Sequence, residues 1–294
     1  MFGKAIKLFF LFVYFGITNI SAQQTYVRVY DYNDIITTLD SYFDKQSFNP
    51  SYTGDTLELK ASLKRSNYWI TVDPEERNFS GLSIERFFDN LSSGIGISYD
   101  YKLNVLKSHI IKINYNYRFS LNSIDVRIAT SLGLNHYTLN TEYSFINPAE
   151  IWNNHPLLSL GILLNYKKHE LGITYSEILD FDISPNDWSD PSIFRDHFIV
   201  NYNYQFNISE SVILTPEIID YWDFDNNFWI LNTSFSFKNR IYAGLFVRSN
   251  NEFGYMIGGR PWKWLTIGCS DSRLGLSYSD YQDSYQSLIF TISF

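Results

Sequence analysis

The sequence predicts an all-β fold: a transmembrane up-and-down antiparallel β-barrel of about 14 strands, with a short N-terminal periplasmic or plug segment. Three observations predict it. The chain starts with a pattern typical of a secretory signal. Segments of about ten residues alternate apolar and polar side chains. The long connections between these segments all fall on one side of the predicted barrel.

Residues 1–22 are predicted to be a signal peptide. Lys4 and Lys7 form the positive region, residues 8–17 form the apolar region, and Ala22 ends a small-residue cleavage site. The apolar run is too short for a membrane-spanning helix, which needs about 20 residues. The sequence therefore predicts an exported chain.

Residues 23–56 are predicted to form a periplasmic or plug segment, and residues 57–294 the barrel. Within the first range, Ile35, Leu39 and Tyr42 recur at helical spacing with Phe43, which is consistent with a short amphipathic helix. A mobile terminal arm is the alternative.

The predicted strands follow one another to the C-terminus. The clearest alternation is in residues 110–119 and 197–206, which are longer than the five or six residues usual in soluble strands. Aromatic residues make up 18% of the chain, yet its mean hydropathy is −0.18, which suits strands with one polar face. The predicted strands are 57–68, 77–88, 93–103, 108–120, 123–139, 157–166, 169–178, 197–207, 212–222, 228–237, 240–249, 252–260, 264–278 and 285–294.

The connections between the predicted strands differ in length. Those at 69–76, 140–156 and 179–196 are long, and all are odd-numbered, whereas the even-numbered ones are tight. Outer-membrane barrels have long extracellular loops and short periplasmic turns. The third and eleventh connections are also short, which weakens this pattern without reversing it.

The last strand alternates through Leu288, Phe290, Ile292 and Phe294. A C-terminal Phe on a half-apolar strand is typical of the closing strand of an outer-membrane barrel, although a soluble sandwich could also end this way. We expect these four side chains to face lipid and the strand to pair with the first one, near residues 57–68.

The charge of the chain excludes some function classes. The formal net charge is −8, which makes nucleic acid an unsuitable partner. Facing lipid, an Arg or Lys would cost about 2–4 kcal/mol at the midplane, so the charged residues of the strands should face the lumen. Both signs are present there, so either a charged network fills the lumen or a water channel crosses it. The lumen-facing set is Glu85, Lys112, Arg118, Asp125 and Arg127.

No pattern predicts an enzyme, a cofactor or a metal centre. The five His are scattered, and neither a nucleophile elbow nor a P-loop is present. The acidic stretch 180–190 could bind calcium but lacks EF-hand spacing, and a solvated loop is the alternative. Four aromatic residues are candidates for partner-facing loops, with the aromatic girdle at the lipid boundary as the alternative: Trp188, Tyr221, Trp222 and Phe224.

One turn before the first strand carries a family resemblance. Asn49, Pro50, Tyr52 and Gly54 form an Asn-Pro-x-Tyr-x-Gly motif with turn chemistry. In an exported chain this motif resembles the PorP/SprF family of outer-membrane proteins of type IX secretion and gliding motility in Bacteroidetes. The segment 196–216 is also similar to a block of that family.

The resemblance implies a non-enzymatic protein in the outer membrane of a Gram-negative, Bacteroidetes-like bacterium. It would anchor or help display a secreted surface adhesin, by contact with the adhesin or its C-terminal domain and with periplasmic components of the type IX machinery. Its extracellular loops 140–156, 180–196 and 220–227 would meet the exported partner. A pore for small solutes and a secreted glycan-binding sandwich are the alternatives.

Overall fold

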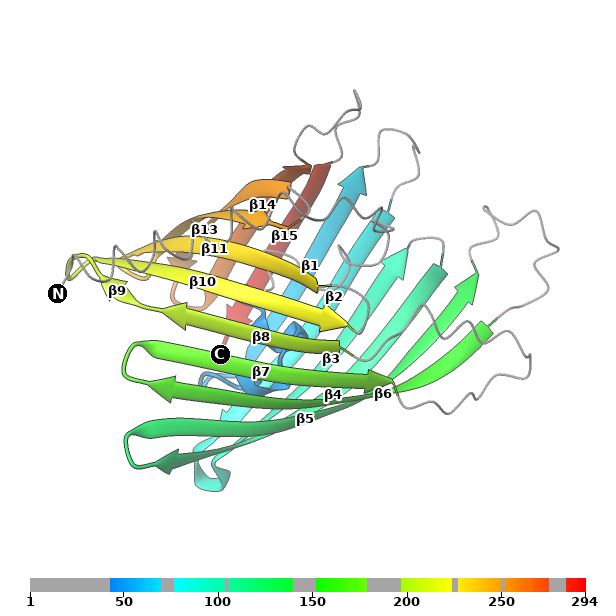
Figure 1. Cartoon of the computed structure of the whole chain (residues 1–294), viewed down its shortest axis with the longest axis horizontal. Coiled ribbons are helices and arrows are strands. Elements are labelled where there is room, and N and C mark those ends of the chain that lie inside the picture. The colour runs from blue at the N-terminus through cyan, green and yellow to red at the C-terminus, as the bar shows by residue number, and fades with distance from the viewer. Residues whose placement is uncertain are drawn as a thin grey trace.

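The computed structural model is a closed barrel of antiparallel strands (Figure 1). It describes residues 43–69, 77–103, 106–139, 152–178, 197–223, 227–249, 252–274 and 284–294. Each strand pairs with its neighbours in sequence, as expected for up-and-down topology. No helix in these ranges is long and apolar enough to cross a membrane.

The strands are mostly ten or more residues long, as a membrane-crossing strand requires. Their bounds are β1 Lys60–Trp69, β2 Arg77–Phe88, β3 Ser93–Leu103, β4 Leu106–Leu121, β5 Ile124–Leu139, β6 Trp152–Tyr166, β7 His169–Ile178, β8 His197–Tyr204, β9 Phe206–Asn207, β10 Val212–Asp223, β11 Asn227–Phe237, β12 Ile241–Arg248, β13 Glu252–Trp262, β14 Leu265–Leu274 and β15 Ser284–Ser293. Short 3-10 turns lie at η2 Lys45–Ser47, η3 Pro50–Tyr52 and η4 Asp89–Leu91.

Strands β8 and β9 are one interrupted strand, because both pair with β10 in the same register. In that register Tyr204 lies opposite Pro216, which has no backbone N–H to donate. The ladder to β10 is therefore broken there. On the other side of the strand, Gln205 N donates to Lys168 O at 3.0 Å and continues the pairing with β7. Counted this way, the barrel has the predicted 14 strands, and the predicted fold class is confirmed.

The barrel closes between its first and last strands. Lys60 lies opposite Ser293 in the β1–β15 pairing, and the register continues to Trp69 opposite Ser284. Beyond the strands, Phe294 N donates to Leu59 O at 2.9 Å, and Leu59 N donates to Phe294 O at 3.1 Å. These bonds leave no unpaired edge at this seam.

The two faces of the sheet differ as period-2 alternation predicts. On β4, Ile111, Ile113 and Tyr115 are exposed on the outer surface, whereas Asn114 and Asn116 are buried inside. In an outer-membrane barrel the outer surface contacts lipid, so an apolar exterior is the stable arrangement.

The turns that follow β2, β4, β6, β9, β11 and β13 are short and lie together at one end of the barrel. The long connections begin and end at the other end, as do the short ones at 104–105, 224–226 and 249–251. The short-turn end also holds the start of β1 and the C-terminus, and in outer-membrane barrels this end is periplasmic. The loop predicted at 140–156 is shorter, because β6 already begins at Trp152. Likewise, most of the stretch 220–227 belongs to β10 and β11.

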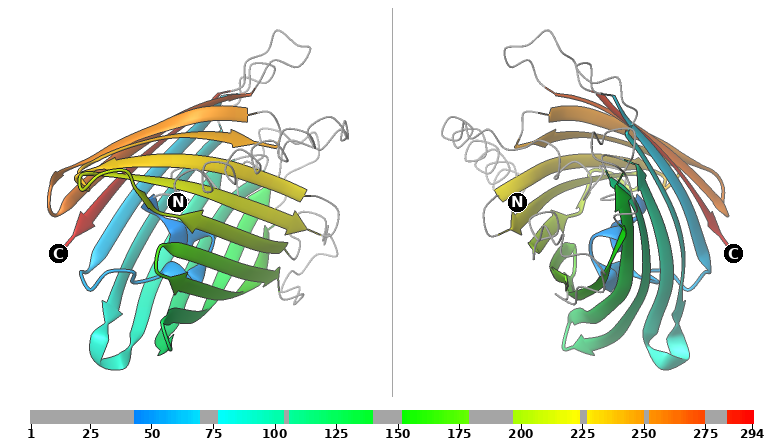
Figure 2. Two further views of the ribbon diagram at one scale, coloured as in Figure 1. Left: turned by 60° about the vertical axis from the view of Figure 1, so that its left-hand side comes forward. Right: turned by 90° about the vertical axis from the view of Figure 1, so that its right-hand side faces the viewer.

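A segment of the chain ahead of β1 lies inside the barrel. Figure 2 shows it in blue between the walls in both views. We call residues 43–54 the inner segment. The signal peptide predicted at 1–22 and the helical pattern from Ile35 to Tyr42 lie outside the described residues.

Candidate functional site: the inner segment and the lumen wall

The inner segment is built from two short 3-10 turns, and the Asn-Pro-x-Tyr-x-Gly motif forms the second. The Asn49 side chain accepts a hydrogen bond from Ser51 N at 2.9 Å and so caps η3. Pro50 follows as the first residue of the turn, where its missing N–H costs nothing. Asn49 is fully buried, so this cap forms inside the barrel.

Gly54 ends the motif in a conformation that favours glycine. Its φ is +63°, and an added Cβ would lie 2.7 Å from Arg86 O. The Gly54 N–H donates to Glu85 Oε2 at 2.6 Å, and Lys60 Nζ lies 2.9 Å from the other oxygen of this carboxylate. Glu85 near the end of β2, paired with Lys60 at the start of β1, thus holds the C-terminal end of the inner segment.

Asn116 on β4 fastens the same turn from the barrel wall. Its Nδ2 donates to Ser51 O at 3.2 Å and to Thr53 O, and its Oδ1 accepts from Gly94 N at 2.9 Å. Gly94 lies beside Thr53 O, so any larger residue there would collide with the inner segment. The wall is therefore shaped to admit this turn.

Gly161 on β6 makes room in the same way. A Cβ at this position would lie 2.6 Å from Asn49 Oδ1 and 2.7 Å from Ser51 Oγ. Such distances are too short for unbonded atoms, so the close approach of the turn to β6 requires glycine.

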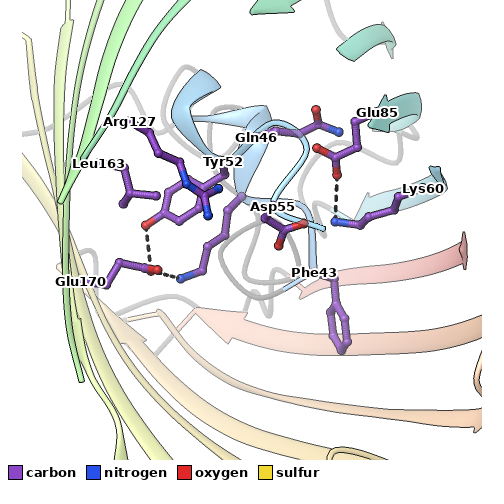
Figure 3. A pocket seen from close by; sticks show the side chains of 10 residues that line it. Phe43, Gln46, Tyr52, Asp55, Lys60, Glu85, Arg127, Leu163 and Glu170 are labelled. Atoms are coloured by element: carbon purple, nitrogen blue, oxygen red, sulfur yellow. Dashed lines mark hydrogen bonds and ion pairs between the residues drawn. The ribbon is translucent and has the colours of Figure 1, made fainter. Parts of the chain in front are cut away.

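Tyr52 and Lys45 meet a cluster of polar side chains on β7 and β8. Figure 3 shows Tyr52 and Glu170 of this cluster. The Tyr52 hydroxyl donates to Glu170 Oε1 at 2.9 Å and accepts from Asn201 Nδ2 at 2.6 Å. Lys45 Nζ donates to the same Glu170 oxygen at 2.8 Å, and Asn203 Nδ2 also donates to it. One carboxylate from β7 thus holds both 3-10 turns.

Lys45 also lies 3.3 Å from Glu217 Oε1 on β10. Burial by itself lowers the pKa of Lys45, but the negative charges of Glu217 and Glu170 outweigh it and hold the pKa well above its usual value. Burial raises the pKa of Tyr52, so its hydroxyl stays protonated and donates to Glu170. The inner segment therefore brings a cation to the buried carboxylate of Glu217 and the half-buried carboxylate of Glu170.

Apolar contacts hold both ends of the inner segment. Phe48 and Tyr52 belong to one buried cluster on the wall with Leu163, Ile199 and Ile219. Their burial, at roughly 1.5–3 kcal/mol for each large apolar side chain, stabilises the docked segment.

Phe43 packs in a second cluster with Met256 and Ile289, and its ring meets Tyr242 edge-on at 6.0 Å. Gly258 and Gly268, paired across β13 and β14, leave space for this ring, because a Cβ at either would lie 2.6–2.7 Å from it. The second cluster thus fixes the start of the described segment on β13–β15.

The turn motif and the closing strand, both predicted as site residues, lie on different faces of the barrel wall. All four residues of the turn motif lie inside the barrel rather than merely leading into β1. On the closing strand, Leu288, Phe290 and Phe294 are exposed on the outer face, and Ile292 is half-buried.

The two described aromatic residues that were proposed for partner-facing loops point to opposite sides of the barrel wall. Tyr221 is in β10, 4% exposed, and stacks on His197 inside the barrel at 5.0 Å, so it is not on a loop surface. Trp222 is also in β10, but it is 45% exposed, which suits the lipid boundary. Trp188, Phe224 and the calcium candidate at 180–190 lie outside the described residues.

Sequence reasoning missed most of the wall residues that hold the inner segment. Asn116 and Glu170 stand on inward-facing rows of their strands, so alternation alone assigns their direction. Their partner lies 50 or more residues away in sequence, and no local pattern specifies it. In the described ranges, no group of three His, Cys, Asp or Glu side chains could hold a metal ion.

The fold and the occupied lumen define an outer-membrane β-barrel that encloses a segment of its own chain. The family described as "Type IX secretion system membrane protein PorP/SprF" matches residues 37–289, and the chain belongs to this family. No curated protein matches the chain.

Several solved barrels share the fold. Omp33, an outer membrane protein of Acinetobacter baumannii, has a TM-score of 0.52 at 11% identity, over 81% of this chain and 99% of that chain. The Ralstonia pickettii toluene transporter TbuX has a TM-score of 0.53 at 7% identity, covering 84% and 92%. A deletion mutant of TodX, a monoaromatic hydrocarbon channel, has 0.54 at 10% identity, covering 83% and 92%. At these identities the likeness concerns the fold alone.

Proposed function

We propose that this barrel is a non-enzymatic component of the type IX secretion and gliding machinery that anchors, or helps display, a secreted surface adhesin. Membership of the PorP/SprF family supports its place in that machinery. The single observation that favours an anchor over a conduit is the occupied lumen. Residues 43–54 stand where a solute would pass, and both polar and apolar contacts hold them there.

The attachment of the inner segment is distributed around the barrel. β2 and β4 hold it through Glu85 and Asn116, and β7 and β10 hold it through Glu170 and Glu217. A passive pore needs a continuous water path, which such a cross-connected segment interrupts. A load-bearing anchor, in contrast, gains rigidity from connections across its lumen.

The two ends of the barrel suit two different partners. The strands joined by the long connections 140–151 and 179–196 end opposite the short turns. We propose that this end is extracellular and binds the exported adhesin or its C-terminal domain. The short turns at the opposite end would face the periplasmic components. We further propose that residues 1–22 are removed as a signal peptide and that residues 23–56 act as the plug.

The anchoring role is tested in cells that lack the barrel. Without it, the adhesin should leave the cell surface and accumulate in the medium, and the intact gene should restore surface display. Affinity purification of the tagged barrel from outer membranes should recover a large secreted protein. Unchanged surface display in the deletion strain would refute the anchor.

A pore for small solutes is the second candidate. Cavities of about 170 and 210 Å³ flank the inner segment, which is the observation that favours it. Planar-bilayer recording of the purified barrel separates the two functions. We expect no steady current from the intact protein, and a stable open-channel current would favour the pore.

A further inference from the structure

A cavity of about 170 Å³ lies between the inner segment and the barrel wall. Figure 3 shows the side chains around it, which come from the inner segment and from several strands. At roughly 30 Å³ for each water molecule, the cavity has room for several waters or one small polar ligand.

Most of the charged groups around this cavity are already paired. Lys45 binds Glu170 at 2.8 Å, and Lys60 binds Glu85 at 2.9 Å. Asp55 also lines the cavity but is exposed, so water can solvate its carboxylate. Of the three cations that line the cavity, one is therefore left without an ion pair to a described residue.

That cation is Arg127 on β5. The residue is 8% exposed, and neither its Nε nor its Nη1 has a hydrogen-bond partner in the part of the chain that the structure describes. Arg118 lies directly opposite on β4 and behaves differently, because it is exposed and its Nε donates to Asp125 at 2.8 Å. Buried guanidinium nitrogens without an acceptor are costly.

We propose that this cavity is a binding site for a carboxylate monoanion, held by the free N–H groups of Arg127. Arg127 Nη1 lies on the end-on edge of the guanidinium, where it can donate a charge-assisted hydrogen bond to a carboxylate oxygen. The lining holds three cations and three carboxylates, and the carboxylates of Asp55, Glu85 and Glu170 disfavour a ligand with more than one negative charge. Leu163 and the Tyr52 ring also line the cavity and suit a short alkyl group next to the carboxylate.

A route to the site leads from the short-turn end. The second cavity, of about 210 Å³, shares Lys45 and Glu170 with the first. It reaches Gln205 and Asn239, which lie at or beside the turns of that end. A ligand arriving from the periplasm would thus pass the Lys45–Glu170 pair before it meets Arg127. The site does not depend on whether the barrel anchors an adhesin.

The test uses the whole folded barrel in detergent micelles, with ¹³C-acetate as the probe and acetamide as its neutral isostere. NMR titration should show saturable binding of acetate and binding of acetamide weaker by about tenfold or more, because the charge-assisted hydrogen bonds are lost. Sulfate should bind more weakly than acetate. Equal binding of acetate and acetamide, or no saturable binding of acetate, would overturn the proposal.

Two matched variants locate the site. Arg127→Gln should weaken acetate binding by about tenfold or more, whereas Arg118→Gln on the facing strand should leave it within about twofold. An equal loss in both variants would contradict binding at Arg127. If Arg127→Gln does not fold, the comparison of acetate with acetamide in the unaltered protein still decides the question.

Two sources could supply the carboxylate, and a peptide pair distinguishes them. A short peptide with a free C-terminal carboxylate that competes with acetate, while its amidated form does not, would identify a polypeptide C-terminus as the ligand. Competition by neither peptide, with acetate still bound, would identify a small free carboxylate. Competition by both peptides equally would overturn a site that recognises the charge.

Discussion

Replacing Asn116 with alanine tests whether the lumen wall holds the inner segment in place. The side chain is fully buried, and its amide donates to Ser51 O and to Thr53 O. The substitution removes both donors and leaves two buried carbonyl groups without them. The backbone ladder between β3 and β4 stays intact, because it does not involve this side chain.

The magnitude follows from these two bonds. At about 1 kcal/mol of net stabilisation for each, the docked inner segment loses about 2 kcal/mol, which is roughly a thirtyfold increase in the undocked population. The third bond, from Gly94 N to Asn116 Oδ1, lies within the wall and contributes to the barrel rather than to docking.

Hydrogen–deuterium exchange of the folded barrel measures this population directly. In the inner segment, Tyr52 N donates to Asn49 O at 3.1 Å, and Thr53 N donates to Pro50 O at 3.1 Å, so both amides are protected while the turn is intact. We expect peptides that cover residues 43–54 to exchange roughly thirtyfold faster in Asn116→Ala, with the strands unchanged.

Asn114→Ala is the matched control. It lies two residues away on the same strand, equally buried, and makes no hydrogen bond to the described inner segment in the structure. Its exchange in residues 43–54 should match that of the unaltered protein. The reasoning fails if Asn116→Ala leaves this exchange unchanged, or if both variants accelerate it equally.

Three further substitutions have defined outcomes. Lys45→Met leaves the buried Glu217 and the half-buried Glu170 without their cation and should destabilise the docked segment by about 3 kcal/mol, seen as faster exchange of residues 43–54 than in Lys45→Arg. Gly161→Ala places a Cβ 2.6 Å from Asn49 Oδ1 and should displace the turn, whereas Gly259→Ala, with 3.6 Å of space, should not; equal exchange in the two would contradict this. Phe294→Asp should reduce outer-membrane yield, because this side chain is 74% exposed on the lipid-facing end of β15, and normal yield would count against that placement.

The strands and their faces could be read from local sequence. Alternation along β4 and β8 specifies which side chains point outward, since successive residues on a strand always face opposite sides. The predicted ends were less accurate. β6 begins five residues earlier than expected, because Trp152 to Pro156 can extend a ladder that their composition does not reveal.

The aromatic stretch around Tyr221 shows what local pattern leaves open. Tyr221 and Trp222 are adjacent aromatic residues, and both interpretations offered for them, a partner-facing loop or a girdle, depend on where the strand ends. The β10 ladder continues to Asp223, so the two rings point to opposite sides of the wall. Pairing with β8 and β11, which are separate in sequence, decides this.

The sequence by itself determined the strand period, the outward row of the closing strand and the Asn49–Gly54 turn, because each follows from neighbouring residues. Only the tertiary structure decided that this turn lies inside the barrel. The contacts that hold it join Tyr52 to Glu170 and Ser51 to Asn116 across long stretches of chain. Such contacts, and the unpaired guanidinium of Arg127 beside them, exist only after the strands have closed around the segment.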